Sequence, residues 1–174
     1  GSFDAKFLGL PAAVIRAVAR GHQKYFSVQR DGDTLAAHYI AVVNTALDPT
    51  RIAKGNDRVM RARLADAQFF FEEDRKAKVE DRVDKLAGIV FHNRLGTVRE
   101  KIARIERLAV KIARGLDVPG EVAKHVERAA HLCKFDLVSL MVGEFPELQG
   151  DMGRAYALDA GEPVAVANAI RDHY

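Results

Sequence analysis

Side chains suited to nucleophilic or acid–base catalysis are present, but their spacing does not assemble a catalytic site. Cys133 follows Leu132 on a core-like face. Its neighbour Lys134 diverges from it by roughly 100° on a helix, so this lysine need not activate the thiol. The carboxylates of residues 72–74 form a run that is typical of a solvated helix end. The glycines are scattered and match neither phosphate-binding fingerprint. The residues therefore predict no catalytic group in this chain.

The segment from Gly96 to Tyr174 is the one that we compare with a metal-binding helical domain. The order of helices expected from Gly96 to Tyr174 resembles that of an HD-type phosphohydrolase domain, in which an adjacent His-Asp pair binds metal. The corresponding segment here, AAHLCKFDL, has Cys133 and Lys134 at the position of that pair. A lysine ammonium cannot ligate a divalent cation and would repel it. Asp136 and His173 remain as isolated candidates, too few for a site. We therefore expect an HD-like fold with a degenerate, metal-free site. A working metal-dependent phosphohydrolase is the alternative that a bound metal would establish.

Basic residues cluster in two segments. Residues 51–63 contain five basic side chains and one acidic side chain, and residues 98–114 contain six and two. Arginine offers bidentate contacts to phosphate, so either segment suits a phosphate backbone. Surface helices also carry many basic side chains that bind no ligand. Arg61 and Arg63 could instead pair with the carboxylates of residues 72–74.

The second basic segment has a helical period. Its cations recur at three- and four-residue steps, which places them on one helix face opposite the apolar residues. This stripe consists of Arg104, Arg107, Lys111 and Arg114. From both segments together, the candidate RNA contacts are Arg58, Arg61, Arg63, Lys101, Arg104 and Lys111.

Residues 1–50 predict a helix and a β-hairpin. A proline, one apolar stripe and a closing glycine indicate a helix over Leu10–Gly21. Lys24–Arg30 alternates, Asp31-Gly32 is a turn signal, and Leu35–Val43 is rich in β formers, which together predict the hairpin. We assign these residues to a small α+β appendage.

Residues 51–174 read as a helical, HD-like domain. Asp48 is expected to cap a short helix that Gly55 ends, and Asp57 to cap the next.

The rest of this region also has clear helical signals. Thr97 and Glu100 form a capping box that starts an amphipathic helix running to Gly115. A fourth long helix is expected to begin near Pro119, to carry apolar residues as far as Leu140 and to stop at or before residues 144–146. Two short helices are expected to follow, within residues 148–158 and 163–173. The predicted class is therefore mainly α.

Composition limits the class of protein further. The chain has 174 residues, 48% apolar and 29% charged, which supports one domain with a small appendage. A single cysteine excludes an internal disulfide and fits a reducing compartment. No apolar run approaches the roughly 20 residues of a membrane span, and residues 1–10 lack the features of a signal peptide. We expect a cytoplasmic, globular chain.

Several long motifs resemble the beta subunit of the bacterial two-subunit glycyl-tRNA synthetase. They are GNDRVMRARLADAQFFFEED (residues 55–74) and VGEFPELQGDMG (142–153), together with HQKYF (22–26), FHNRLGT (91–97) and LCKFD (132–136). They occur in the family's order and roughly its spacing, so the resemblance covers nearly the whole chain. The family's subunit is several times longer, which implies an internal fragment.

The resemblance implies participation in the ATP-dependent charging of tRNA-Gly. In this family the alpha subunit activates glycine, so ATP and Mg are expected there and no cofactor is expected in this fragment. The beta subunit binds tRNA and completes a heterotetramer, which makes tRNA-Gly and the alpha subunit the expected partners, with no membrane and no DNA. The implied task is to position the acceptor arm of the tRNA. A purely structural scaffold for subunit assembly is the alternative.

Overall fold

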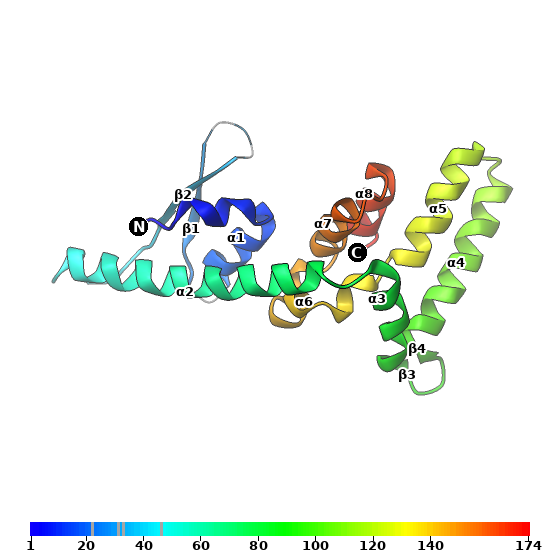
Figure 1. Cartoon of the computed structure of the whole chain (residues 1–174), viewed down its shortest axis with the longest axis horizontal. Coiled ribbons are helices and arrows are strands. Elements are labelled where there is room, and N and C mark those ends of the chain that lie inside the picture. Colours follow the sequence, from blue (N-terminus) through cyan, green and yellow to red (C-terminus); the bar gives the residue numbers. More distant parts are fainter. Residues whose placement is uncertain (22, 31, 33, 46) are drawn as a thin grey trace. The chain divides into compact units, whose positions relative to one another are not determined.

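The computed structural model describes residues 1–174 except 22, 31, 33 and 46, so the predicted turn at Asp31 and the first residue of the HQKYF motif lie outside it. The described chain forms two compact units, Gly1–Glu72 and Glu73–Tyr174. Each contains one small antiparallel sheet, and helices dominate both (Figure 1). The predicted mainly α class is confirmed. The likeness to HD-type domains stays a prediction.

The first unit has a hairpin and a short helix, as the sequence predicts. The helix α1 spans Ala12–Arg20, and the strands β1 (Phe26–Gln29) and β2 (Leu35–Ile40) pair antiparallel. Ser2 forms a bridge with His38, so β2 lies between the N-terminal segment and β1. Among the described residues, β1 is therefore an edge strand. A 3-10 helix, η1 (Ala5–Gly9), connects the N-terminal segment to α1.

The helix α2 corrects the predicted boundary at Gly55. It runs without a break over Pro49–Arg75. Asp48 does cap its first turn, because its Oδ1 accepts from the Arg51 amide at 2.9 Å. Gly55 lies inside the helix, where a glycine costs about 1 kcal/mol, too little to end a helix that other residues favour. Asp57 caps nothing. Its Oδ1 accepts from the Tyr39 hydroxyl at 2.7 Å, and this bond ties α2 to the hairpin. The first compact unit, Gly1–Glu72, includes most of this helix. The predicted domain division at residue 50 stays a prediction.

The second unit is a helical assembly with a small hairpin, β3 (Val90–His92) and β4 (Gly96–Thr97), within the FHNRLGT motif. This hairpin differs from the helices predicted for this part of the chain. The helices α4 and α5 lie side by side and run antiparallel (Figure 1). The remaining elements are α3 (Val79–Lys85), η2 (Leu86–Gly88), α4 (Val98–Gly115), α5 (Gly120–Leu132), η3 (Phe135–Val138), α6 (Leu140–Glu144), η4 (Pro146–Leu148), α7 (Asp151–Asp159) and α8 (Val164–Asp172).

The capping box at the start of α4 is confirmed. The Thr97 Oγ1 accepts from the Glu100 amide at 3.2 Å, and the Glu100 Oε2 accepts from the Thr97 amide at 2.7 Å. The apolar stripe of α4 covers the core only in its first half. Val98 and Ile102 pack with Leu86, Cys133 and their neighbours in a buried cluster.

The second half of that stripe is exposed, which the sequence analysis did not anticipate. Leu108, Ile112 and Leu116 are 59%, 53% and 71% exposed. At 100° per residue, Leu108 and Ile112 lie roughly 120° and 80° around the helix from Ile102, so they point past the core.

The predicted fourth long helix is wrong beyond Leu132. The chain leaves helical geometry at Lys134, passes through η3, and restarts at α6 after Ser139. Tertiary contacts cause this break. Phe135 and Asp136 are both fully buried, and a continuous helix would direct them to different faces.

The run of carboxylates at the end of α2 is not solvated throughout. Asp74 is 5% exposed. Its carboxylate accepts from the amides of Leu140 and Met141, at 2.9 and 3.0 Å, and from the Tyr156 hydroxyl at 2.7 Å. The buried Arg82 guanidinium lies 3.9 Å away. Asp74 therefore bonds to this cluster and does not pair with Arg61 or Arg63.

None of the helices in the described residues has the length and apolarity needed to cross a membrane.

Candidate nucleic-acid interface

A row of cations occupies the outer face of α4. We call Arg104, Arg107, Lys111 and Arg114 the α4 cation face; all four are exposed. At 100° per residue they lie roughly 120° to 200° around the helix from the buried Ile102, so burial of Ile102 turns them outward. Within the described part of the chain, no ion pair involves any of the four.

Shallow hollows flank the α4 cation face. One of about 450 Å³ is lined by Arg99, Arg104 and Arg107 together with nearby carboxylates. Another of about 380 Å³ reaches across to Glu127 of α5 and contains Arg107, Lys111 and Arg114. Arg107 lines both, so the two hollows form a continuous basic strip. Carboxylates within it reduce its net charge, but Glu106 is partly engaged with His131, 3.4 Å from the ring Nδ1.

Lys101 differs from the cations of this face. Its Nζ lies 4.0 Å from the centroid of the Phe91 ring, on the β3–β4 hairpin. This cation–π contact holds the ammonium beside the FHNRLGT motif. Lys101 is half-buried and sits at the edge of the cation face, so it could contact RNA only together with the hairpin.

The other three predicted RNA contacts lie on α2, in the first unit. Arg58 and Arg61 are exposed, and Arg63 is half-buried with contacts of its own. Burial raises the pKa of Asp57, but the Tyr39 hydroxyl, the Ser2 amide and nearby cations including Arg61 outweigh it, and the pKa is lowered. The six predicted residues are therefore divided, three in each unit. The structure brings together Lys101, Arg104 and Lys111. The roles of all six stay predictions.

The residues that correspond to the degenerate metal site have structural partners. The buried Asp136 carboxylate accepts from the amides of Gly150 and Gly153 at 2.7 and 3.2 Å, and from the Tyr174 hydroxyl at 3.0 Å. The His173 Nδ1 lies 2.6 Å from the Ile170 carbonyl oxygen. In the described residues, no group of three His, Cys, Asp or Glu side chains could hold a metal ion.

Two further groups near Asp136 argue against chemistry there. The Lys134 Nζ lies over the Tyr174 ring, 3.6 Å from its centroid, so a cation is held against the ring whose hydroxyl donates to Asp136. Burial raises the pKa of the Cys133 thiol to about 11, and the opposing effect of Lys134 is smaller. A reactive cysteine needs a lowered pKa, so Cys133 is a core residue.

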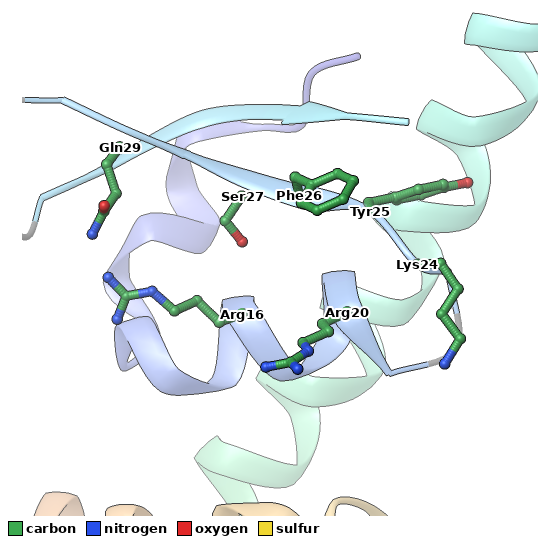
Figure 2. A pocket seen from close by; sticks show the side chains of 7 residues that line it. All are labelled: Arg16, Arg20, Lys24, Tyr25, Phe26, Ser27 and Gln29. Carbon is green, nitrogen blue, oxygen red and sulfur yellow. The ribbon is translucent and has the colours of Figure 1, made fainter. Parts of the chain in front are cut away.

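The first unit has a larger basic hollow that the sequence analysis did not find. It measures about 600 Å³ and lies between α1 and the edge strand β1 (Figure 2). Arg16 and Arg20 come from the helix, Lys24 from the connection, and Phe26 from the strand. In the sequence, Arg16, Arg20 and Lys24 recur at four-residue steps. This spacing indicates a basic hollow only once the strand is known to pack beside the helix.

The whole chain, residues 1–174, matches the family model described as the glycyl-tRNA synthetase beta subunit. It is 50% identical over 175 residues to the glycine–tRNA ligase beta subunit of Trichlorobacter lovleyi, with 100% of this chain and 25% of that protein covered. It is 51% identical to the beta subunit of Geobacter sp. strain M21, of which it covers 25%, and 45% identical to that of Bacillus subtilis, of which it covers 26%. The whole of this chain is covered in both comparisons. The chain thus spans about a quarter of the length of these relatives. It belongs to the glycyl-tRNA synthetase beta subunit family.

Proposed function

We propose that this part of the beta subunit holds the phosphates of the tRNA-Gly acceptor arm during ATP-dependent charging and catalyses no step itself. The observation that carries the proposal is the α4 cation face, four exposed cations on one helix without an ion pair among the described residues. Family membership supplies the nucleic acid that such a face would meet. In this proposal, ATP and Mg bind the alpha subunit, and the two kinds of subunit assemble as a heterotetramer in the cytoplasm.

Phosphate contacts suit a positioning role. Three of the four cations in the α4 cation face are arginines, whose planar guanidinium can hold a phosphate by two hydrogen bonds. From Arg104 to Arg114 the helix rises roughly 15 Å, enough to contact several successive phosphates. Contacts of this kind fix the register of a nucleic acid without reading its sequence. Lys101 and the α2 residues Arg58, Arg61 and Arg63 are proposed as additional contacts.

A scaffold role is the second candidate, and one observation favours it. Leu108 and Ile112 are exposed beside the cation face, and such an apolar strip suits packing against another part of the synthetase. In that case the α4 cations would meet acidic side chains of the rest of the beta subunit or of the alpha subunit, and not RNA.

Salt-dependent RNA binding separates the two roles. We would measure the affinity of the chain for a tRNA-Gly acceptor minihelix from 50 to 300 mM salt, with an unrelated hairpin as the competitor. The test variant is Arg104→Glu with Lys111→Glu. The control is Lys76→Glu with Lys124→Glu, which changes the net charge equally at two exposed lysines already paired with Glu73 and Glu121.

The phosphate-contact role predicts a specific change of slope. Each lost contact should reduce the slope of log K against log salt by about 1, hence by about 2 for the test variant and not for the control. Equal affinity for both RNAs would confine the role to positioning without discrimination. If the test and control variants lose the same affinity, or the wild-type chain and the whole beta subunit both fail to bind at low salt, the scaffold role replaces it.

A further inference from the structure

We propose that the hollow between α1 and β1, here called the α1–β1 pocket, binds a nucleotide. Arg20 and Lys24 would hold the phosphate, and the Phe26 ring would stack on the base. The pocket belongs to the first unit, whereas the α4 cation face belongs to the second, so this inference does not depend on the role of α4. Its volume of about 600 Å³ lies within the range of sites for small molecules.

The cations of the pocket come from two short segments that fold back on each other. Arg16 and Arg20 are four residues apart on α1, so they lie on the same helix face. Figure 2 shows both extending along the floor of the hollow, with Lys24 at one end of it. Arg20 and Lys24 are exposed, and no ion pair involves either within the described part of the chain.

The backbone holds Lys24 in place at some cost. Its φ is +56°, in the left-handed region that side chains other than glycine rarely adopt. Its Nζ donates to the Gly21 carbonyl oxygen at 2.8 Å, at the C-terminal end of α1. An ammonium has three N–H donors, so two remain for a ligand. Strained residues of this kind concentrate at ligand sites, which supports the assignment.

Strand β1 supplies groups suited to a base and a ribose. Phe26 lines the pocket and is 61% exposed, whereas phenylalanine side chains are usually buried. Figure 2 shows Ser27 and Gln29 pointing from β1 toward the helix that carries the cations. Their hydroxyl and amide can donate and accept hydrogen bonds with a base edge or a ribose hydroxyl.

The combination of groups points to a nucleotide rather than to a simple anion or a peptide. An inorganic anion would use the cations and leave the Phe26 ring without a role. A carboxylate-bearing peptide would add to the β1 edge and would not need three cations in one hollow. A nucleotide uses both parts, because single-stranded nucleic acids are bound by cations on the backbone and aromatic rings on the bases. The same chemistry is presented by single-stranded RNA and by a free mononucleotide.

The test uses the whole chain with four probes: inorganic phosphate, adenosine, AMP and the single-stranded pentanucleotide rA5. Affinities are measured by titration calorimetry. The chain contains no tryptophan, so Phe26→Trp places the only tryptophan of the variant at the pocket, where its fluorescence can be excited apart from that of the tyrosines, and it keeps an aromatic ring. Stacking of a base on this ring should quench its fluorescence.

Matched variants isolate each half of the pocket. Phe26→Ala removes the ring, and its control is Ile40→Ala, at the cross-strand partner of Phe26, which is 58% exposed and outside the pocket. Arg20→Gln with Lys24→Gln removes the phosphate contacts, and Lys6→Gln with Arg51→Gln, two exposed cations outside the pocket, is its control.

The expected result is that AMP or rA5 binds, and that Phe26→Ala weakens binding by about 5- to 150-fold, the range for loss of one stacked base. Both controls should bind as the wild type does. Binding of rA5 but not of AMP, weakened by Phe26→Ala, identifies single-stranded RNA as the ligand of the pocket. Binding of AMP, weakened in the same way, identifies a free nucleotide. The proposal is overturned if phosphate binds as tightly as AMP with no effect of Phe26→Ala, or if neither AMP nor rA5 binds.

Discussion

Removing the Asp74 carboxylate should cost the second unit a large part of its stability. Asp74 and Arg82 form a buried pair whose side chains are 6% and 4% exposed. Breaking a buried pair by deleting one partner typically costs 3–5 kcal/mol, because the other charge stays buried without compensation. Two amides and the Tyr156 hydroxyl also lose their acceptor.

The surroundings of Arg82 decide where in that range the cost falls. Its guanidinium also donates to the Asp74 carbonyl oxygen and lies 4.4 Å from the centroid of the Tyr156 ring. Asp74→Ala leaves both contacts in place. We therefore expect about 3–4 kcal/mol, a substantial share of the 5–15 kcal/mol of a typical domain. Tyr156→Phe keeps the pair and removes one hydrogen bond to a charged group, for which we expect about 1.5–3 kcal/mol.

Hydrogen exchange and urea unfolding together test this reasoning. Urea unfolding followed by circular dichroism gives the loss of free energy, and exchange at the Leu140 and Met141 amides reports the bonds to Asp74 directly. In the Asp74→Ala background, Arg82→Met should cost much less than in the wild type, because the uncompensated charge is then removed. The reasoning is refuted if Asp74→Ala costs under about 1 kcal/mol or if the two substitutions are additive.

Three further predictions concern the second unit. Burial raises the pKa of the Cys133 thiol from 9.0 to about 11, so about 100-fold less of it is thiolate, the reactive form, at pH 8. Cys133 should therefore react with DTNB at pH 8 about 100-fold more slowly in the native chain than in urea. Equal rates would contradict its burial. Arg128 and, secondarily, His131 lower the pKa of Glu80 by hydrogen bonds. The Glu80 carboxylate therefore stabilises the folded chain above the pKa of an unfolded glutamate, and this stabilisation is lost as the pH falls through the lower pKa of the folded state. The Tm of Glu80→Gln should accordingly lie below that of the wild type at neutral pH and equal it in acid. Parallel Tm curves of the two proteins from pH 3 to 7 would exclude the effect. Thr97→Ala should cost about 1 kcal/mol in urea unfolding, with Thr97→Ser restoring most of it.

Features determined by neighbours in sequence were predictable. The capping box needs only Thr97 and Glu100 at a spacing of three, and both of its hydrogen bonds are present. The hairpin of the first unit follows from alternation and from β-forming residues on each side of a turn. Asp48 caps a helix because its carboxylate reaches the amide three residues later. In each case the causes lie within a few residues of the effect.

Features determined by distant partners were not predictable. Asp74 looks like the end of a solvated acidic run, and only its contact with amides 66 and 67 residues away shows that it is buried. The helix break after Leu132 follows from the burial of Asp136 against Gly150 and Gly153. The α1–β1 pocket likewise requires a strand beside a helix. A pattern in the sequence identifies the side chain, but it does not identify the distant partner that determines whether this side chain is buried, paired or exposed.

The direction of the α4 cations combines both kinds of cause. The local capping box fixes where the helix starts, and the burial of Ile102 against Leu86 and Cys133 fixes its rotation. Once the first residue and the rotation of α4 are fixed, the three- and four-residue spacing of the cations places the α4 cation face on the outer side of the helix. The cations themselves contribute nothing to that core, so their reversal should change RNA affinity without changing the free energy of unfolding. The exposed Leu108 and Ile112 follow from the same rotation. Their exposure is therefore a consequence of how α4 is anchored, and it does not by itself require a partner protein, which is why the RNA-positioning role takes precedence over the scaffold role.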